Sequence, residues 1–151
     1  MGTIRVEVTV SNLSDRSRSR SLFVFVDTGA TYTRLPAEVI DALGCEPIGT
    51  RQVLLANGRE EEWPVSAVLL RVDGREGPTF CLIGPPGSPA LLGAVTLEEF
   101  ALGVDPVAQR LVPVRSYLLG ASAGVARNRR LEEIGRVSVW HGSSAPTGAG
   151  R

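Results

Sequence analysis

The chain has 151 residues, of which 43% are hydrophobic. This is enough for one domain with its own core and too apolar for a disordered protein. Sixteen basic residues, all of them Arg, balance sixteen acidic ones, so the net charge indicates neither nucleic acid nor a membrane surface as a partner. No run approaches the roughly 18 apolar residues that cross a bilayer, and the first ten residues lack a signal-peptide pattern. We therefore expect a cytoplasmic protein.

The cysteines and the histidine exclude several kinds of site. Cys45 and Cys81 are the only cysteines, and His141 is the only histidine. The spacing of the cysteines fits no metal site. Because His141 lies in the tail, the sequence also argues against a Cys-His or Ser-His catalytic set. We predict no metal and no cofactor, and two free thiols in a reducing compartment.

The first two predicted strands lead to an aspartate. Apolar and polar residues alternate over Ile4–Val10, which predicts a strand with one buried face. A polar connection over 11–21 is predicted to be a hairpin loop. The continuous apolar run Leu22–Val26 predicts a strand buried on both faces. It ends on Asp27, and the Thr28–Gly29 pair that follows forces a turn.

Position alone leaves two interpretations of Asp27. A carboxylate beside apolar walls is costly unless it is hydrogen-bonded, paired or protonated, so a chain that places one there usually uses it. The structural alternative is an Asp that opens a turn or caps the following helix.

A short helix and two hairpins are predicted next. The segment Leu35–Gly44 has Pro near its start, Gly past its end and an apolar face, as a short helix has. Asn57–Gly58 lies between two strand-like runs and is the strongest hairpin signal, because both turn positions tolerate positive φ. Its place in the chain favours a flap over an ordinary surface hairpin. A second hairpin turns at Asp73–Gly74 and is interpreted as structural.

The last elements surround a second apolar motif. The proline-rich segment Gly84–Pro89 is predicted to be a rigid loop that leads into Ala90–Ala94. Thr96–Leu102 is predicted to be a short helix capped by Thr96. After a turn at Asp105, Arg110–Val114 is predicted to be the last strand.

Composition changes after this strand. From Arg115 onward Gly, Ala, Ser and Arg dominate. We predict a domain over 1–115 and a C-terminal tail over 116–151, flexible or docked on a partner, with a loose helix over Leu118–Ile134.

Two motifs together carry a family resemblance. The string Asp27-Thr28-Gly29-Ala30-Thr31 after an apolar strand resembles the active-site motif of the aspartic proteases, in particular the single-domain, retroviral-type (retropepsin-like) branch and its bacterial members. Ala90–Ala94 is similar to the apolar-apolar-Gly segment that passes beside the catalytic turn in that family. The resemblance covers Thr3–Val114. It implies an all-β fold, a closed barrel with one or two short helices and one lobe per chain.

The resemblance also implies roles for individual residues. It assigns a catalytic role to Asp27, Thr28 and Gly29. It implies that an extended peptide substrate is bound by Ala30, Leu55, Ala56, Asn57, Gly58 and Leu92. The family's chemistry needs two carboxylates that share one proton across a water. Because the chain offers one such Asp, the second must come from a second copy, and the implied enzyme is a homodimeric endopeptidase.

Two alternatives stay open. The same barrel could be a catalytically inactive module for dimerisation or peptide binding, or a small β-domain without a cleft in which Asp27 only starts a turn. The chain departs from the viral pattern in having Ala94-Val95 where Arg and a polar residue usually follow the Gly, and in having a flap tip with Gly58 as its one glycine.

Overall fold

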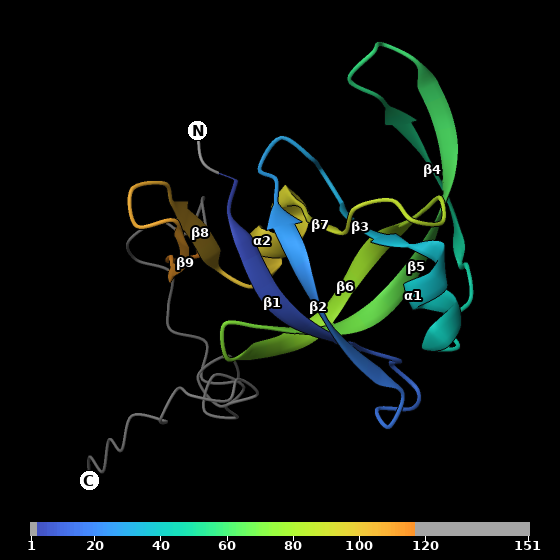
Figure 1. The fold of residues 1–151 in the computed structure, drawn as a ribbon, viewed down its shortest axis with the longest axis horizontal. Coiled ribbons are helices and arrows are strands. Elements are labelled where there is room, and N and C mark those ends of the chain that lie inside the picture. Colours follow the sequence, from blue (N-terminus) through green and yellow to red (C-terminus); the bar gives the residue numbers. More distant parts are fainter. Residues whose placement is uncertain (1–2, 117–151) are drawn as a thin grey trace, which may run out of the picture.

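The computed structural model describes residues 3–116, in which strands dominate and two short helices occur (Figure 1). The elements in chain order are β1 (Arg5–Ser11), β2 (Ser19–Val26), β3 (Thr33–Pro36), α1 (Ala37–Ala42), β4 (Gly49–Leu54), β5 (Glu60–Val72), β6 (Arg75–Gly84), β7 (Leu91–Leu92), α2 (Ala94–Glu99), β8 (Leu102–Asp105) and β9 (Arg110–Pro113).

Seven strands form one sheet that closes on itself. The strand order is β1-β2-β7-β3-β6-β5-β4, and β1 also pairs with β5, where Val10 lies opposite Leu70. This last pairing makes a ring of six strands and leaves β4 outside it, paired only with the first half of β5. The predicted all-β, single-lobe fold with short helices is confirmed.

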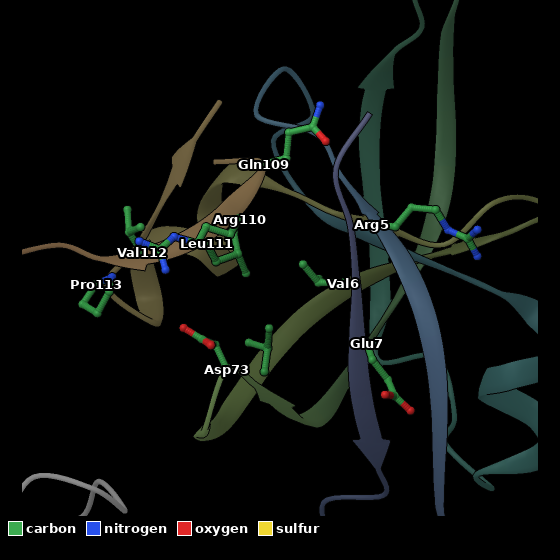
Figure 2. A pocket seen from close by; sticks show the side chains of 10 residues that line it. Arg5, Val6, Glu7, Asp73, Gln109, Arg110, Leu111, Val112 and Pro113 are labelled. Carbon is green, nitrogen blue, oxygen red and sulfur yellow. The ribbon is translucent and has the colours of Figure 1, made fainter. Parts of the chain in front are cut away.

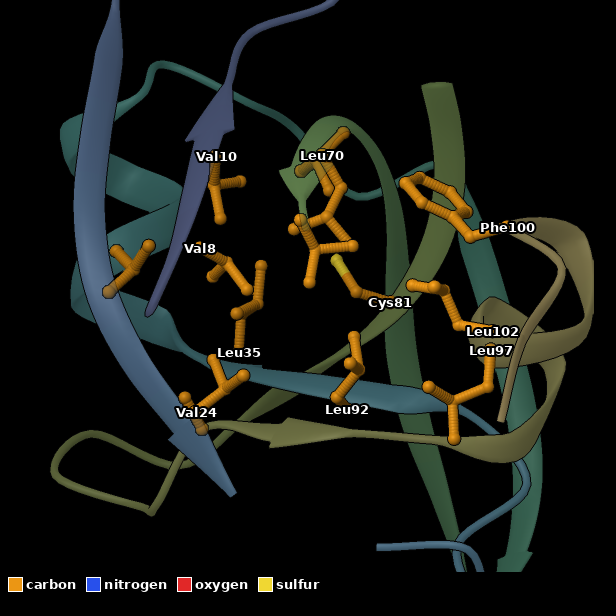
Figure 3. Packing of buried hydrophobic residues seen from close by; sticks show 14 of the residues in the cluster. Val8, Val10, Val24, Leu35, Leu70, Cys81, Leu92, Leu97, Phe100 and Leu102 are labelled. Carbon is orange, nitrogen blue, oxygen red and sulfur yellow. The ribbon is translucent and has the colours of Figure 1, made fainter. Parts of the chain in front are cut away.

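The inside of the ring is filled by one hydrophobic cluster (Figure 3). Alternate residues of the strands point inward, as the period of two requires. The buried side chains labelled in the figure are Val8, Val10, Val24, Leu35, Leu70, Cys81, Leu92, Leu97, Phe100 and Leu102.

The prediction that the apolar run before Asp27 is buried on both faces is wrong. Val24 is buried, but Phe23 is 57% exposed. A barrel buries only the inner face of its strands, and neither α1 nor α2, the helices of residues 3–116, packs against β2. The Arg5 guanidinium lies over the rings of Phe23 and Phe25, 5.1 and 5.4 Å from their centroids, and partly covers them instead.

Both helices differ from their predicted bounds. The first residues of the predicted helix Leu35–Gly44 belong to β3, because Leu35 pairs in parallel with Ile83 of β6, and α1 begins only at Ala37. Helix α2 begins at Ala94, two residues before the predicted start. Gly93 occupies its N-cap position without a side-chain cap, and Thr96 is buried inside the helix.

Both predicted hairpins exist, but the turn at Asn57–Gly58 does not have the two positive φ values expected of it. At Asp73–Gly74 both residues have positive φ, 51° and 74°, as in a two-residue type I′ turn. At Asn57–Gly58 only Gly58 does, at 80°, and its N–H donates to Leu55 O at 2.9 Å. The tip therefore turns over Leu55–Gly58, with Ala56 and Asn57 at the two central positions and Gly58, at positive φ, in the last position.

The last predicted strand forms, but outside the ring. β9 pairs with β8 in a separate two-stranded sheet, after the turn that follows Asp105. The predicted tail over 116–151 and its helix over Leu118–Ile134 lie outside the described residues, apart from residue 116, so this domain boundary stays a prediction.

Candidate active site

The turn after β2 holds Asp27 by backbone hydrogen bonds on both sides. The Asp27 N–H donates to Leu92 O at 3.0 Å, which continues the parallel pairing of β2 with β7. The Ala30 N–H donates to Asp27 O at 3.2 Å and closes the turn. The Gly29 N–H donates to Asp27 Oδ1 at 3.0 Å, so one carboxylate oxygen has a fixed direction.

Gly93 lets the second motif lie directly against this turn. A Cβ at Gly93 would lie 2.4 Å from the carbonyl carbon of Tyr32, a distance that real Cβ atoms essentially never show. Beyond it, the Ala94 N–H donates to Ala30 O at 2.8 Å and the Val95 N–H donates to Thr31 O at 3.0 Å. The predicted position of Ala90–Ala94 beside the turn is confirmed, and only a glycine permits so close an approach.

Three buried hydroxyl groups fasten the two segments to the barrel. Thr96 Oγ1 lies 2.7 Å from Thr33 Oγ1 and 2.8 Å from Thr79 Oγ1, and all three residues are at most 4% exposed. The Gly93 N–H donates to Thr33 Oγ1 at 3.1 Å. Because buried hydroxyl groups without partners are costly, this network specifies the positions of β3, β6 and α2 around the turn.

The Asp27 side chain is exposed in the single chain, as are Thr28 and Gly29. It is thus not enclosed by apolar walls as its place after an apolar run suggested. A carboxylate at the end of a barrel strand, oriented by a backbone N–H, can accept a proton or a hydrogen bond from a group that approaches from outside the chain.

Arg34 is the cation whose charge interacts with that of Asp27. It lies on β3, is half-buried, and its Nε donates to Pro89 O at 3.0 Å. Burial lowers the pKa of Arg34, and the negative charge of Asp27 opposes this shift.

The structure groups the predicted site residues into two sets. Asp27, Thr28, Gly29, Ala30 and Leu92 come together at the end of β2. The other four, Leu55, Ala56, Asn57 and Gly58, form the tip of the β4–β5 hairpin. In Figure 1 this hairpin and the turn after β2 both extend toward the same, upper side of the barrel.

Among residues 3–116, the hairpin tip forms hydrogen bonds only within itself. The Leu55 N–H donates to Arg59 O at 2.8 Å, and the Arg59 N–H donates to Asn57 Oδ1 at 3.0 Å. Ala56, Asn57 and Gly58 are exposed, while Leu55 is half-buried. Whether the tip covers a substrate stays a prediction.

A pocket of about 550 Å³ lies elsewhere on the chain, between β1, the β5–β6 turn and β9 (Figure 2). None of the predicted site residues lines it. Val6 points from β1 toward β9, whereas Arg5 points away from the pocket. The pocket is therefore separate from the set of residues around Asp27.

Within residues 3–116, no group of three His, Cys, Asp or Glu side chains is arranged to hold a metal ion. Neither α1 nor α2, the helices in this part of the chain, is long enough to cross a membrane.

Sequence reasoning missed the three threonines and Arg34. Thr33 and Thr79 lie in unremarkable strand sequence, and Thr96 was interpreted as a helix cap. Arg34 immediately precedes the predicted helix Leu35–Gly44 and was assigned no role. Arg34 lies seven positions after Asp27 in the sequence, and β7, which pairs with both β2 and β3, brings their strands into one neighbourhood.

The comparisons with known proteins agree with this geometry. Residues 6–105 match the family model for aspartyl proteases. The EIAV protease complexed with the inhibitor HBY-793 has 20% sequence identity and a TM-score of 0.52, over 65% of this chain and 88% of that one. No curated protein matches the chain.

Two further solved structures are similar at lower TM-scores. The protease of simian foamy virus (mac) has 22% identity and a TM-score of 0.45, over 62% of this chain and 90% of that one. A retropepsin-like aspartic protease from Rickettsia conorii has 21% identity and a TM-score of 0.38, over 70% of this chain and 94% of that one.

A closed single-lobe barrel with an Asp-Thr-Gly turn against an apolar-apolar-Gly segment defines the retropepsin-like class of folds. With its match over 6–105, this chain belongs to the aspartyl protease family.

Proposed function

We propose that this chain is an aspartic endopeptidase that acts as a homodimer, with Asp27 of each copy facing one water. The observation that carries the proposal is the placement of Asp27. It follows the β2 strand, is oriented by the Gly29 N–H at 3.0 Å and is exposed in the single chain. The family membership supports peptide hydrolysis as the reaction.

The other aspartates of the chain do not supply a second carboxylate at this turn. Asp15 lies in the β1–β2 connection, Asp41 in α1, Asp73 in the β5–β6 turn and Asp105 at the end of β8. A two-fold axis that passes beside Asp27 would place Asp27 of a second copy of the chain opposite it. The site is therefore incomplete in one chain and complete in two.

The proposed mechanism uses one shared proton. Two carboxylates at hydrogen-bonding distance cannot both ionise, so one stays protonated and the other is the base. The ionised Asp27 takes a proton from the water, whose oxygen attacks the peptide carbonyl carbon, while the protonated Asp27 donates to the carbonyl oxygen. The Asp27 that took the proton of the water then gives it to the amide nitrogen, the other Asp27 takes a proton from a hydroxyl group of the tetrahedral species, and the C–N bond breaks to give the acid and the amine. The pair titrates as one unit.

The neighbours take supporting roles in this proposal. Thr28 would hydrogen-bond across the two-fold axis and join the two turns, and Gly29 and Ala30 leave room for the substrate backbone. The hairpin tip, Leu55–Gly58, would cover an extended peptide bound by strand-like hydrogen bonds and exclude water. Free thiols at Cys45 and Cys81 support the cytoplasm as the compartment.

The test is cleavage of a peptide library between about pH 4 and pH 7, the range in which a shared-proton pair is active. Asp27→Asn should abolish cleavage without changing the dimer mass measured by sedimentation equilibrium. Asp41→Asn, an exposed aspartate on α1, is the matched control and should cleave as the wild type does. Cleavage that survives Asp27→Asn, or a wild type that is monomeric while it cleaves, would refute the proposal.

A second candidate is an inactive module that dimerises or binds peptides. Ala94 and Val95, which stand where Arg and a polar residue usually follow the Gly, favour the loss of turnover in this candidate, because side-chain contacts that the resemblance links to a firmly held active dimer are missing. The backbone N–H groups of Ala94 and Val95 still hold this segment against Ala30 and Thr31. A dimer that binds library peptides and never cleaves them would select this candidate.

A further inference from the structure

Arg34 occupies a defined place beside the Asp27 turn. Leu91 of β7 pairs with Phe25 of β2 on one side and with Arg34 of β3 on the other. Residues paired across a sheet point to the same face, and two strand spacings amount to about 10 Å. Asp27 lies two positions after Phe25. Its Cβ therefore leaves the backbone on the same face of the sheet as Arg34. Thr33 and Leu35 on either side of Arg34 are buried in the core, so Arg34 points out of the barrel.

The side chain of Arg34 is fixed up to Nε, and its two terminal nitrogens can bind a ligand. Its Nε donates to Pro89 O at 3.0 Å. Its side-chain carbons fill the space where Gly84 has no Cβ, since a Cβ there would lie 3.0 Å from Arg34 Cδ. Within residues 3–116 its two terminal nitrogens have no hydrogen-bond partner and no ion pair. The four N–H groups on these nitrogens can donate, in a fork that matches a carboxylate.

Partial burial of Arg34 disfavours its charged form, and an anion bound to its terminal nitrogens would offset this cost. Asp27 contributes negative charge nearby but does not form an ion pair with Arg34 in the described chain. In the proposed dyad one Asp27 is protonated, which reduces this charge further. The space beside Arg34 therefore favours an anionic group supplied from outside the chain.

We propose that Arg34 determines substrate specificity by binding an acidic side chain of the peptide, an inference that rests on the proposed peptidase function. The charge of Arg34 acts over about 10 Å at ordinary salt concentrations. In an extended peptide substrate this distance spans about three residues. The acidic residue should thus lie within about three positions of the scissile bond. Since the two-fold axis gives two Arg34 side chains, an acidic preference should appear on both sides of that bond.

The test compares kcat/KM for matched peptides that carry Glu or Gln at the preferred position of a library substrate. The wild type should favour Glu by about tenfold or more, and Arg34→Gln should reduce this ratio to about one. Arg34→Glu should transfer the preference to Lys-containing peptides. Arg34→Lys should keep part of the preference for Glu. Arg20→Gln, at the opposite end of β2 from Asp27, is the matched control and should keep the full ratio.

The outcomes separate this inference from the proposed function. A role of Arg34 in stability alone would lower kcat/KM for both peptides equally and leave the ratio unchanged, which would overturn the inference. Equal cleavage of Glu and Gln peptides by the wild type, with cleavage lost in Asp27→Asn, would overturn it and leave the peptidase intact. A wild type that cleaves no peptide would overturn both.

Discussion

The turn that carries Asp27 and the hairpin that carries Gly58 are built in opposite ways. The turn donates or accepts backbone hydrogen bonds with β7 and with the start of α2, and a buried threonine network lies behind it. The hairpin tip bonds only to itself, and most of β4 is exposed. Local stability follows buried contacts, so the turn should open only with global unfolding and the hairpin far more easily. The proposed peptidase would need this division, because its catalytic groups must be fixed while its cover must admit substrate.

The largest expected effect comes from filling the space at Gly93. Gly93→Ala places a Cβ against the Tyr32 backbone, which cannot move without breaking the turn, so we expect a loss of about 3 kcal/mol or more in the free energy of unfolding. Urea denaturation measures it. Gly49→Ala in β4, where the added Cβ has an ordinary contact at 3.9 Å from Val65, is the control and should be close to neutral. Equal losses at the two positions would contradict the comparison.

The threonine network should give the next largest effect. Thr96→Val keeps the shape but leaves Thr33 and Thr79 without their shared partner, which costs about 2 kcal/mol. Thr96→Ser retains the hydroxyl and should lose about half as much. Both values come from the same denaturation measurement. If the valine variant is as stable as the wild type, the network does not fasten the turn.

A pH dependence should arise on the turn side of the molecule. Cys81 pairs with Thr33 across β3 and β6, and burial raises the pKa of its thiol from 9.0 to about 12. The folded state keeps this proton where the unfolded state loses it, so stability is full below about pH 9 and falls as the pH rises toward 12. We expect a loss of roughly 1.5 kcal/mol between pH 9 and pH 10.5. Cys81→Ala should flatten this part of the curve, and an unchanged slope in that variant would assign the loss to other groups.

The smallest effect should come from the hairpin. The added Cβ of Gly58→Ala meets no atom within 4 Å, but Ala is strained at φ +80°. We expect a loss of about 1 kcal/mol or less in the free energy of unfolding, because the tip can relieve the strain by opening locally. Hydrogen exchange should quicken over 49–62 and stay unchanged at Asp27 and Leu92. Gly58→Asn, which tolerates positive φ, should behave like the wild type. Faster exchange around Asp27 in the alanine variant would show that the two regions are coupled.

Several features of the fold were readable from the sequence because they depend on local chemistry. The alternation in β1, the turn residues at Asp73–Gly74 and the short helix before Gly44 were all found. The predictions were wrong where residues distant in the sequence determined the local structure. Leu35 joined a strand because β6 lay beside it, and Thr96 became a core residue because Thr33 and Thr79 needed a partner.

The candidate site divides in the same way. The Asp-Thr-Gly string and the apolar-apolar-Gly segment identified the turn, since each motif is a short run with an unusual backbone requirement. Arg34 and the threonines were not identified, because nothing in their own sequence neighbourhoods distinguishes them. They matter through residues up to 63 positions away in the chain.

By itself, the sequence determined the kind of turn this chain makes and the strand that leads into it, because apolar runs and glycines act within a few residues. Only the tertiary structure decided that β7 returns beside Asp27, that Phe23 faces outward and that β3, with Arg34, lies next to β7. These depend on how the ring of strands closes, and closure is a property of long-range pairing that no local segment contains.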